Sequence, residues 1–251
     1  MEKTIEKPSF GEFTTIKLDD DLIFNAERVG PYNFKGLREA DYGQGFRMAT
    51  LPELVPLIHS SLENKDYQTA KEVIKTLRNN WLTGNTSVLY TPKGMFVQDN
   101  PKMKEGRIYM DEKELESRLG SYQEKEVTFS DDRTIRFTPY EFKREAQSSL
   151  DLSKNSGIIA LVNGEENAEN LARSSEHYKI KPYFYALTNV DSPQIRVPGL
   201  GSGGFGYRLC IYAVVRESYD VRFSFGVSDV PKARAPKPKM STSFGSKTWR
   251  L

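Results

Sequence analysis

The chain has 251 residues, of which 37% are hydrophobic and 28% charged, and its formal net charge is +2. These values are typical of a folded globular protein with a sizeable core and exclude an intrinsically disordered chain. A net charge this close to zero gives no general attraction to nucleic acid, so none is expected as a partner. No stretch approaches the roughly 20 apolar residues of a membrane span, so no membrane insertion is expected.

The beginning of the chain, residues 1–7, lacks the apolar core of a secretory signal. We therefore expect a cytoplasmic location, with association with a cell surface or a particle left open.

Cysteine and histidine are scarce. Cys210 is the one cysteine in the sequence, which excludes an internal disulfide and a cysteine metal site. The two histidines, His59 and His177, have no ligand-like spacing. We expect no metal and no cofactor.

The first part of the chain favours short strands followed by a loop. Apolar residues at 13–18 and 22–24 indicate two strands, and the glycines of 30–45, together with Pro31, indicate a loop.

Two helices are expected next. Thr50 and Glu53 have the spacing of a capping box, and Pro52 falls in the first turn, where a missing amide costs little. An apolar stripe then runs from 51 to 62, and a second amphipathic pattern covers 66–79.

The middle of the chain indicates short strands and helices in alternation. We expect a hairpin of 88–91 with 95–97, a charged helix at 111–119, strands at 127–129, 134–137, 157–162 and 178–187, and a helix at 165–174. These elements predict one domain over residues 1–230, followed by a basic, proline-rich tail at 231–251 that is expected to be extended and solvated.

The glycine-rich stretch 199–206 matches G-x-G-x-x-G twice. A dinucleotide or phosphate site needs a helix directly after such a run, whereas the next segment here is strongly strand-like. We interpret the run as a flexible turn that lets backbones approach closely.

Known catalytic patterns are absent from the sequence. No Ser-His-Asp or Cys-His arrangement stands out, and the acidic pairs Asp131-Asp132 and Glu165-Glu166 lie in charged, surface-like contexts. The expectation is therefore a protein that is not an enzyme and has no catalytic residues.

The C-terminal segment predicts a β-hairpin. Apolar residues alternate over 209–215 and again over 221–227, with the turn at 216–219, so a second face carries a mixture of aromatic, aliphatic and charged side chains. Tyr and Arg are enriched at binding hot spots, which favours recognition by this face over an ordinary covered hairpin. The candidate ligand-binding residues are Phe205, Tyr207, Arg208, Cys210, Tyr212, Val214, Arg216, Ser218, Tyr219, Asp220 and Arg222.

Two segments carry a family resemblance. Residues 45–54, GFRMATLPEL, resemble the signature G-[WYF]-R-L-P-T-x-x-E-[LW] of one branch of the C-type-lectin fold, with Met48 and Ala49 in place of leucine and proline. This branch includes formylglycine-generating enzymes and the variable proteins of diversity-generating retroelements. Residues 203–227 are similar to the C-terminal hairpin of archaeal-type variable proteins, which close with an S-x-G-V element, here Ser224 to Val227.

The resemblance implies an α+β, C-type-lectin-like fold with two helices in the N-terminal half, short antiparallel strands and a C-terminal β-hairpin. Residues 102–181 show no resemblance and are expected to be an insert. The implied function is ligand binding through a diversified hairpin surface. The ligand would be an unidentified macromolecule, with a protein favoured, and the protein a monomer or small oligomer. The calcium-binding triplets of sugar-binding lectins are absent.

Diversification by such retroelements replaces adenines in chosen codons and never yields Lys, Gln, Met, Trp or Glu. Residues 203–229 contain none of the first four, and Glu217 is the one exception, which would be a fixed position. A core hairpin also avoids lysine and glutamine by ordinary propensity.

Two alternatives stay open. One is a structural or particle-assembly protein on the same fold. The other is a divergent oxidase of the formylglycine-generating type, which Cys210 on its own disfavours because those enzymes use a pair of cysteines.

Overall fold

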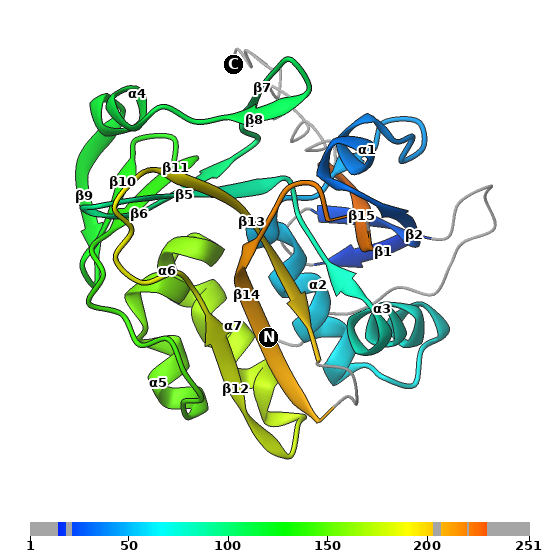
Figure 1. Cartoon of the computed structure of the whole chain (residues 1–251). Coiled ribbons are helices and arrows are strands. Elements are labelled where there is room, and N and C mark those ends of the chain that lie inside the picture. The colour runs from blue at the N-terminus through cyan, green and yellow to red at the C-terminus, as the bar shows by residue number, and fades with distance from the viewer. Residues whose placement is uncertain (1–14, 19–21, 203–206, 220, 230–251) are drawn as a thin grey trace, which may run out of the picture.

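The structure is a computed structural model that describes residues 15–18, 22–202, 207–219 and 221–229. Within these ranges the chain forms an α+β fold in which helices cover one large, mostly antiparallel sheet (Figure 1). No helix in this part of the chain is long and apolar enough to cross a membrane. The α+β class expected from the sequence is confirmed.

The helices are α1 (Phe34–Glu39), α2 (Leu51–Glu63), α3 (Gln68–Asn79), α4 (Glu112–Ser117), α5 (Ser149–Ser153), α6 (Ser156–Val162) and α7 (Glu165–Glu176). The strands of the first half are β1 (Thr15–Leu18), β2 (Leu22–Tyr32), β3 (Arg47–Met48), β4 (Trp81–Leu82), β5 (Thr86–Thr91), β6 (Gly94–Asp99), β7 (Lys102–Lys104) and β8 (Arg107–Tyr109). Those of the second half are β9 (Leu119–Glu124), β10 (Val127–Ser130), β11 (Ile135–Thr138), β12 (Ile180–Tyr185), β13 (Gln194–Gly201), β14 (Arg208–Val215) and β15 (Arg222–Asp229).

The sheet brings the first and last described strands together. Its main path runs β1-β2-β15-β4-β13-β5-β6-β11-β10-β9, with β3 paired to β15 and β14 paired to both β12 and β13. β15 pairs antiparallel with β2, from Arg222 opposite Tyr32 to Asp229 opposite Leu22. β15 is therefore an interior strand, which explains why Phe225 and Val227 are fully buried.

Two hydrophobic clusters lie on opposite faces of the sheet. Val88 belongs to the larger cluster, together with α2, α6 and α7, whereas its neighbour Leu89 belongs to a second cluster with α1 and α4. Successive residues of a strand point to opposite faces, so the two clusters cover different sides. In Figure 1, α2, α6 and α7 lie behind β12, β13 and β14, whose other face is turned to the viewer.

Most elements expected from the sequence are confirmed. The capping box at Thr50 and Glu53 is present, and Pro52 lies in the first turn of α2. The second helix, the hairpin of β5 with β6, the short charged helix α4, the β10–β11 pair, helix α7 and strand β12 all form where their patterns indicated. Strands β1 and β2 also form, and β2 continues to Tyr32.

Two expectations were wrong in type. Residues 157–162 form helix α6, because the Asn155 side chain accepts hydrogen bonds from the amides of Gly157 and Ile158 and starts a helix buried on all sides. Full burial removes the alternation that separates helix from strand in an apolar run. The expected loop at 30–45 contains α1, which Asn33 caps by accepting from the Gly36 amide.

The expected C-terminal hairpin is also wrong. A turn does form, with the Tyr219 amide donating to the Arg216 carbonyl, but no ladder joins β14 to β15 in the described residues. β14 pairs with β12 and β13, and β15 pairs with β2, β3 and β4. The inward positions were correct for Leu209, Ile211 and Ala213 of β14, but the alternation expected over 221–227 was wrong, because Val221 is 45% exposed while Arg222 and Ser224 are buried. Alternation also does not specify a partner strand.

The domain boundaries stay predictions. Residues 102–181, the expected insert, supply Phe129 and Ile158 to the larger cluster and Ile108 and Leu115 to the smaller one. The segment is therefore part of both cores. The tail at 231–251 lies outside the described residues.

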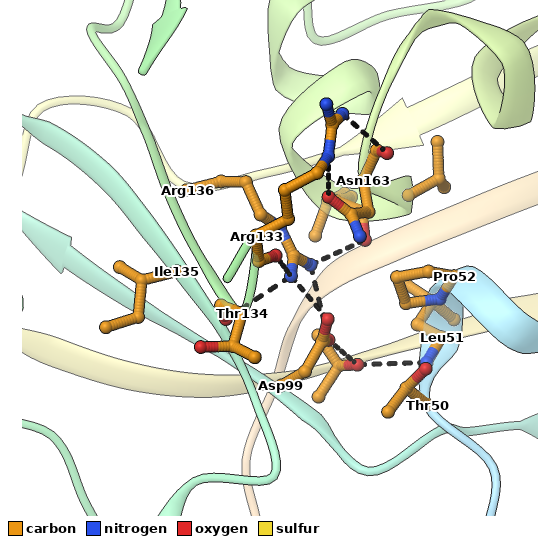
Figure 2. Close-up of polar contacts among 12 residues, drawn as sticks. Thr50, Leu51, Pro52, Asp99, Arg133, Thr134, Ile135, Arg136 and Asn163 are labelled. Carbon is orange, nitrogen blue, oxygen red and sulfur yellow. Dashed lines mark hydrogen bonds and ion pairs between the residues drawn. The ribbon is translucent and has the colours of Figure 1, made fainter. Parts of the chain in front are cut away.

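A buried ion pair joins five elements of the fold (Figure 2). Arg136 of β11 is fully buried and is paired with Asp99 at the end of β6. Its guanidinium also donates to the carbonyls of Ala160 and Leu161 in α6. Asp99 accepts from the Thr86 hydroxyl of β5 at 2.6 Å, and that hydroxyl accepts from the Leu51 amide of α2 at 2.9 Å.

Asp99→Asn should lower the free energy of unfolding by about 3–5 kcal/mol, because it leaves the Arg136 guanidinium buried without a counter-charge. Urea denaturation followed by circular dichroism measures the loss. Glu114→Gln is the control, since it removes the exposed pair with Lys102, and it should cost about 0–1 kcal/mol. Equal losses in the two variants would contradict a structural role for the buried pair.

Candidate ligand-binding face

Stacked tyrosines cross from β12 to β14. Tyr183 and Tyr185 are two residues apart on β12 and share a face, with ring centroids 4.1 Å apart at an interplanar angle of 28°. Tyr185 is in register with Tyr212 of β14, and these rings stack at 4.3 Å and 11°. The parallel pairing of β12 with β14 thus turns an alternating pattern into a continuous stack.

Trp81 of β4 extends this stack across β13. Its ring meets Tyr212 edge-on, with centroids 4.2 Å apart at 80°. The indole lies over Gly201 of β13, where a Cβ atom would come within 3.0 Å of ring atoms Cε3 and Cζ3. The glycine is therefore what allows an aromatic ring from a strand on one side of β13 to touch one from the other side.

We call Trp81, Tyr212, Tyr185 and Tyr183 the aromatic row. All four side chains are partly exposed, and the Arg208 guanidinium lies 5.5 Å from the centre of the Tyr183 ring at one end. Each aromatic contact contributes about 0.5–1.5 kcal/mol beyond area burial. The contacts hold the rings in place before any ligand arrives, which lowers the entropic cost of binding.

The opposite face of β14 anchors the strand. Leu209, Ile211 and Ala213 are fully buried in the larger cluster, as the sequence predicted. Arg208, Tyr212 and Val214 on the other face are partly exposed, and so is Val215, which was expected on the inward face. One face of this half of the expected hairpin is therefore buried in the core, and the other face is partly exposed except at Cys210.

Cys210 shares the face of Tyr212 but is 4% exposed and free. Burial raises the pKa of its thiol, so the uncharged form dominates near neutral pH. Burial, with Cys210 and Tyr185 close by, also raises the pKa of the Tyr212 phenol above its usual value. The face therefore offers hydroxyl groups and aromatic rings, and no thiolate nucleophile.

The turn after β14 carries a second exposed group. Arg216, Ser218 and Tyr219 are exposed, and Tyr207 is exposed at the start of β14. Glu217 in their midst is anchored, because its carbonyl accepts from the Phe34 amide at 3.3 Å and its carboxylate accepts from the Ile108 amide at 3.0 Å. The turn is thus fastened to α1 and β8.

Several candidate residues do not lie where the sequence placed them. Arg222 was expected on the outer face but is 1% exposed, because β15 is an interior strand, and it donates to the Arg216 carbonyl. Burial lowers the pKa of Arg222 to about 10. Ser224, also expected on that face, is fully buried. Phe205 and Asp220 lie outside the described residues.

The glycine-rich run needs a further correction. Gly199 and Gly201 belong to β13 and are not in a turn, although the close approach expected of them is present at Trp81. Residues 203–206 are not described.

The sequence did not single out Trp81, Tyr183 or Tyr185. The alternation of Tyr183 with Tyr185 in an expected strand was a usable signal, since it puts both rings on one face. Nothing local indicated that Trp81, more than 100 positions earlier, would join them.

Over the described ranges, no three His, Cys, Asp or Glu residues come together in a way that could hold a metal ion. The candidate site for a ligand is the aromatic row, because its four rings are in mutual contact and partly exposed.

Comparisons with known proteins give limited results. No family model matches the chain, and no curated protein matches it. A solved structure described as "Accommodation of massive sequence variation in Nanoarchaeota by the C-type lectin fold" aligns over 80% of this chain and 95% of its own, with 14% identity and a TM-score of 0.48.

The described residues define a class, an α+β protein with a preorganised aromatic face on its sheet.

Gly201→Ala should displace the Trp81 ring from Tyr212 and destabilise the fold by about 1–3 kcal/mol through overpacking. In a Trp249→Phe background Trp81 is the sole tryptophan, so its fluorescence should shift to longer wavelength as the ring loses its contact. Gly199→Ala on the same strand is the control, because its Cβ would meet the Thr83 hydroxyl instead of the indole. Identical spectra for the two variants would contradict the role assigned to Gly201.

Proposed function

We propose that the chain is a ligand-binding protein with a C-type-lectin-like fold, and that it holds a protein ligand against the aromatic row and the outer face of β14. The observation that carries the proposal is the stack of three tyrosines and one tryptophan, drawn from three strands and partly exposed.

The composition of the face favours a protein ligand. Trp, Tyr and Arg are the residues that most often dominate binding energy at protein interfaces, and the row with Arg208 consists of these types alone. Tyrosine offers a large rigid ring and a hydroxyl at little cost in conformational entropy. Contacts of this kind suit a varied protein surface better than a single small molecule.

The pairing of β3 with β15 supports the proposal of a C-type-lectin-like fold. The two segments that carry the resemblance meet in space, because Met48 pairs with Gly226 and Arg47 with Val227 in the β3–β15 ladder. Helices α2 and α3 follow directly, as the resemblance implies.

A diversified surface is supported by the pattern of exposure. The outward positions at Arg208, Tyr212, Val214, Arg216 and Tyr219 are at least partly exposed, whereas Glu217 is held by backbone amides of two other elements. Glu217 is also the one residue of this segment that adenine replacement does not yield. If Glu217 is a fixed structural residue between variable positions, both its hydrogen bonds and its residue type are explained.

An oxidase of the formylglycine-generating type is disfavoured. That chemistry uses a pair of cysteines, and Cys210 is the one cysteine of the chain and is buried.

The double variant Tyr185→Ala/Tyr212→Ala should weaken capture of a protein ligand from the native source by more than about tenfold, because it removes the centre of the row. Immobilised full-length protein and quantitative mass spectrometry give the measurement. Tyr67→Ala, an exposed tyrosine at the start of α3, is the control and should bind as the wild type does. Equal capture by the double variant would refute the assignment of this face.

The same variant separates ligand binding from particle assembly. Solution mass at micromolar concentration should be that of a monomer or small oligomer for both proteins. A closed assembly that dissociates in Tyr185→Ala/Tyr212→Ala would mean that the face binds other copies of the chain.

Sequencing of this gene in sister isolates tests diversification. Substitutions should concentrate at outward positions of 207–219 and spare Glu217, while 60–80 serves as the internal control. Substitutions spread evenly over both segments would refute diversification. The proposed binding face would still be tested separately by Tyr185→Ala/Tyr212→Ala.

A further inference from the structure

A cleft of about 670 Å³ opens on another part of the molecule, between the starts of α2 and α7 and strand β9. Its lining residues are Leu22, Pro52, Glu53, Pro56, Tyr122, Glu124, Arg133, Asn163, Gly164, Glu165, Glu166 and Asn167. We call it the acidic cleft, because four carboxylates and one guanidinium give its lining a net of three negative charges.

Half of these carboxylates are engaged by the fold itself. Glu124 accepts from the Tyr122 hydroxyl at 2.6 Å and from the Glu165 amide and Arg133 at 3.1 Å each. Although burial opposes the charged form, these partners hold the pKa of Glu124 below its usual range. Glu53 is paired with Arg47. Figure 2 shows Arg133 in contact with Asn163, and both residues line the cleft.

The other two carboxylates have no such partner. Glu165 is partly exposed, Glu166 is exposed, and neither forms an ion pair with a described residue. Beside them lies the ring of Tyr122, which is 51% exposed, and the buried residues Pro52 and Pro56 form the apolar wall of the cleft. A ligand that fits has spaced positive charges and apolar groups that pack on an aromatic ring.

The chain carries a segment of that description directly after β15 in the sequence. β15 ends at Asp229, which is paired with Leu22, and Leu22 lines the acidic cleft. The residues that follow, 231–239, read PKARAPKPK, with four basic residues and three prolines. Residues 230–251 contain no Asp or Glu.

We propose that residues 231–239 dock in the acidic cleft of the same molecule. Nine residues in an extended, proline-rich conformation reach about 28 Å at ~3.1 Å per residue, ample for a cleft that begins beside the last paired residue. The exposed ring of Tyr122 suits prolines, as aromatic grooves suit proline-rich peptides, and the basic residues of the segment carry the charge opposite to that of Glu165 and Glu166. The short connection makes the local concentration of the segment high, so weak contacts suffice.

Paramagnetic relaxation in the full-length protein tests this directly. A nitroxide on Ala235→Cys, in a Cys210→Ala background, should broaden the amide signals of Tyr122, Glu166 and Asn167. Raising the salt concentration should weaken the broadening, since exposed charges are screened. Broadening that is absent, or that falls on other surfaces, overturns the proposal.

Charge reversal supplies the matched comparison. Glu165→Lys/Glu166→Lys should abolish the broadening. Glu126→Lys/Glu141→Lys reverses two exposed carboxylates that line a separate cleft of about 430 Å³, and should leave it intact. Equal loss in both double variants means a non-specific charge effect and overturns the proposal.

Two further experiments test the charges of the segment and whether it docks within one molecule. Changing Lys232, Arg234, Lys237 and Lys239 to Gln should also abolish the broadening, and it does not touch the described fold. A mixture of nitroxide-bearing protein with isotope-labelled, nitroxide-free protein should show no broadening. If it does, the occupant is a second copy, and docking within one molecule is wrong. None of these results depends on the aromatic row.

Discussion

The Arg136–Asp99 ion pair is the constraint on which the rest of the structure depends. A fully buried guanidinium is costly unless its donors are satisfied, and here they reach Asp99 and carbonyls from several elements. Asp99 in turn orders the Thr86 hydroxyl, which caps the start of α2 through the Leu51 amide. Strands from the middle of the sheet and helices from both halves of the chain are thereby fixed in one geometry. Apolar packing tolerates many arrangements, whereas this network satisfies its polar atoms in one.

The candidate binding face arises from strand neighbours and not from a hairpin. β14 lies between β12 and β13, and β4 lies on the far side of β13. The glycine at 201 leaves the space through which Trp81 reaches Tyr212. Side chains separated by more than 100 positions therefore form one row of rings. Because the helices cover the other side of β14, its outward side chains can change without disturbing the core, which is what a recognition surface needs.

Glu217 and Arg222 illustrate how the fold divides scaffold from surface within one short segment. Both are charged, and both lie close in sequence to Arg216, Ser218 and Tyr219, which are exposed. Glu217 accepts hydrogen bonds from α1 and β8, and Arg222 is buried at the start of an interior strand. The composition of the segment does not distinguish a charged residue of the scaffold from one of the exposed surface. The partners that distinguish the roles come from the first half of the chain.

The sequence by itself determined the local elements whose causes are local. The capping box at Thr50 starts α2, and apolar residues recur at helical spacing along α3. The inward set Leu209, Ile211 and Ala213 of β14 follows from alternation alone. Residues of the candidate binding face on β14 could be predicted in this way. The tertiary structure alone decided that 157–162 is a helix, that β14 and β15 have different partners, and that Trp81 and Tyr185 join Tyr212. The reason is physical: periodicity records which side of an element is buried, but the element that buries it is selected by long-range packing and by buried polar groups such as Arg136 that must find their partners.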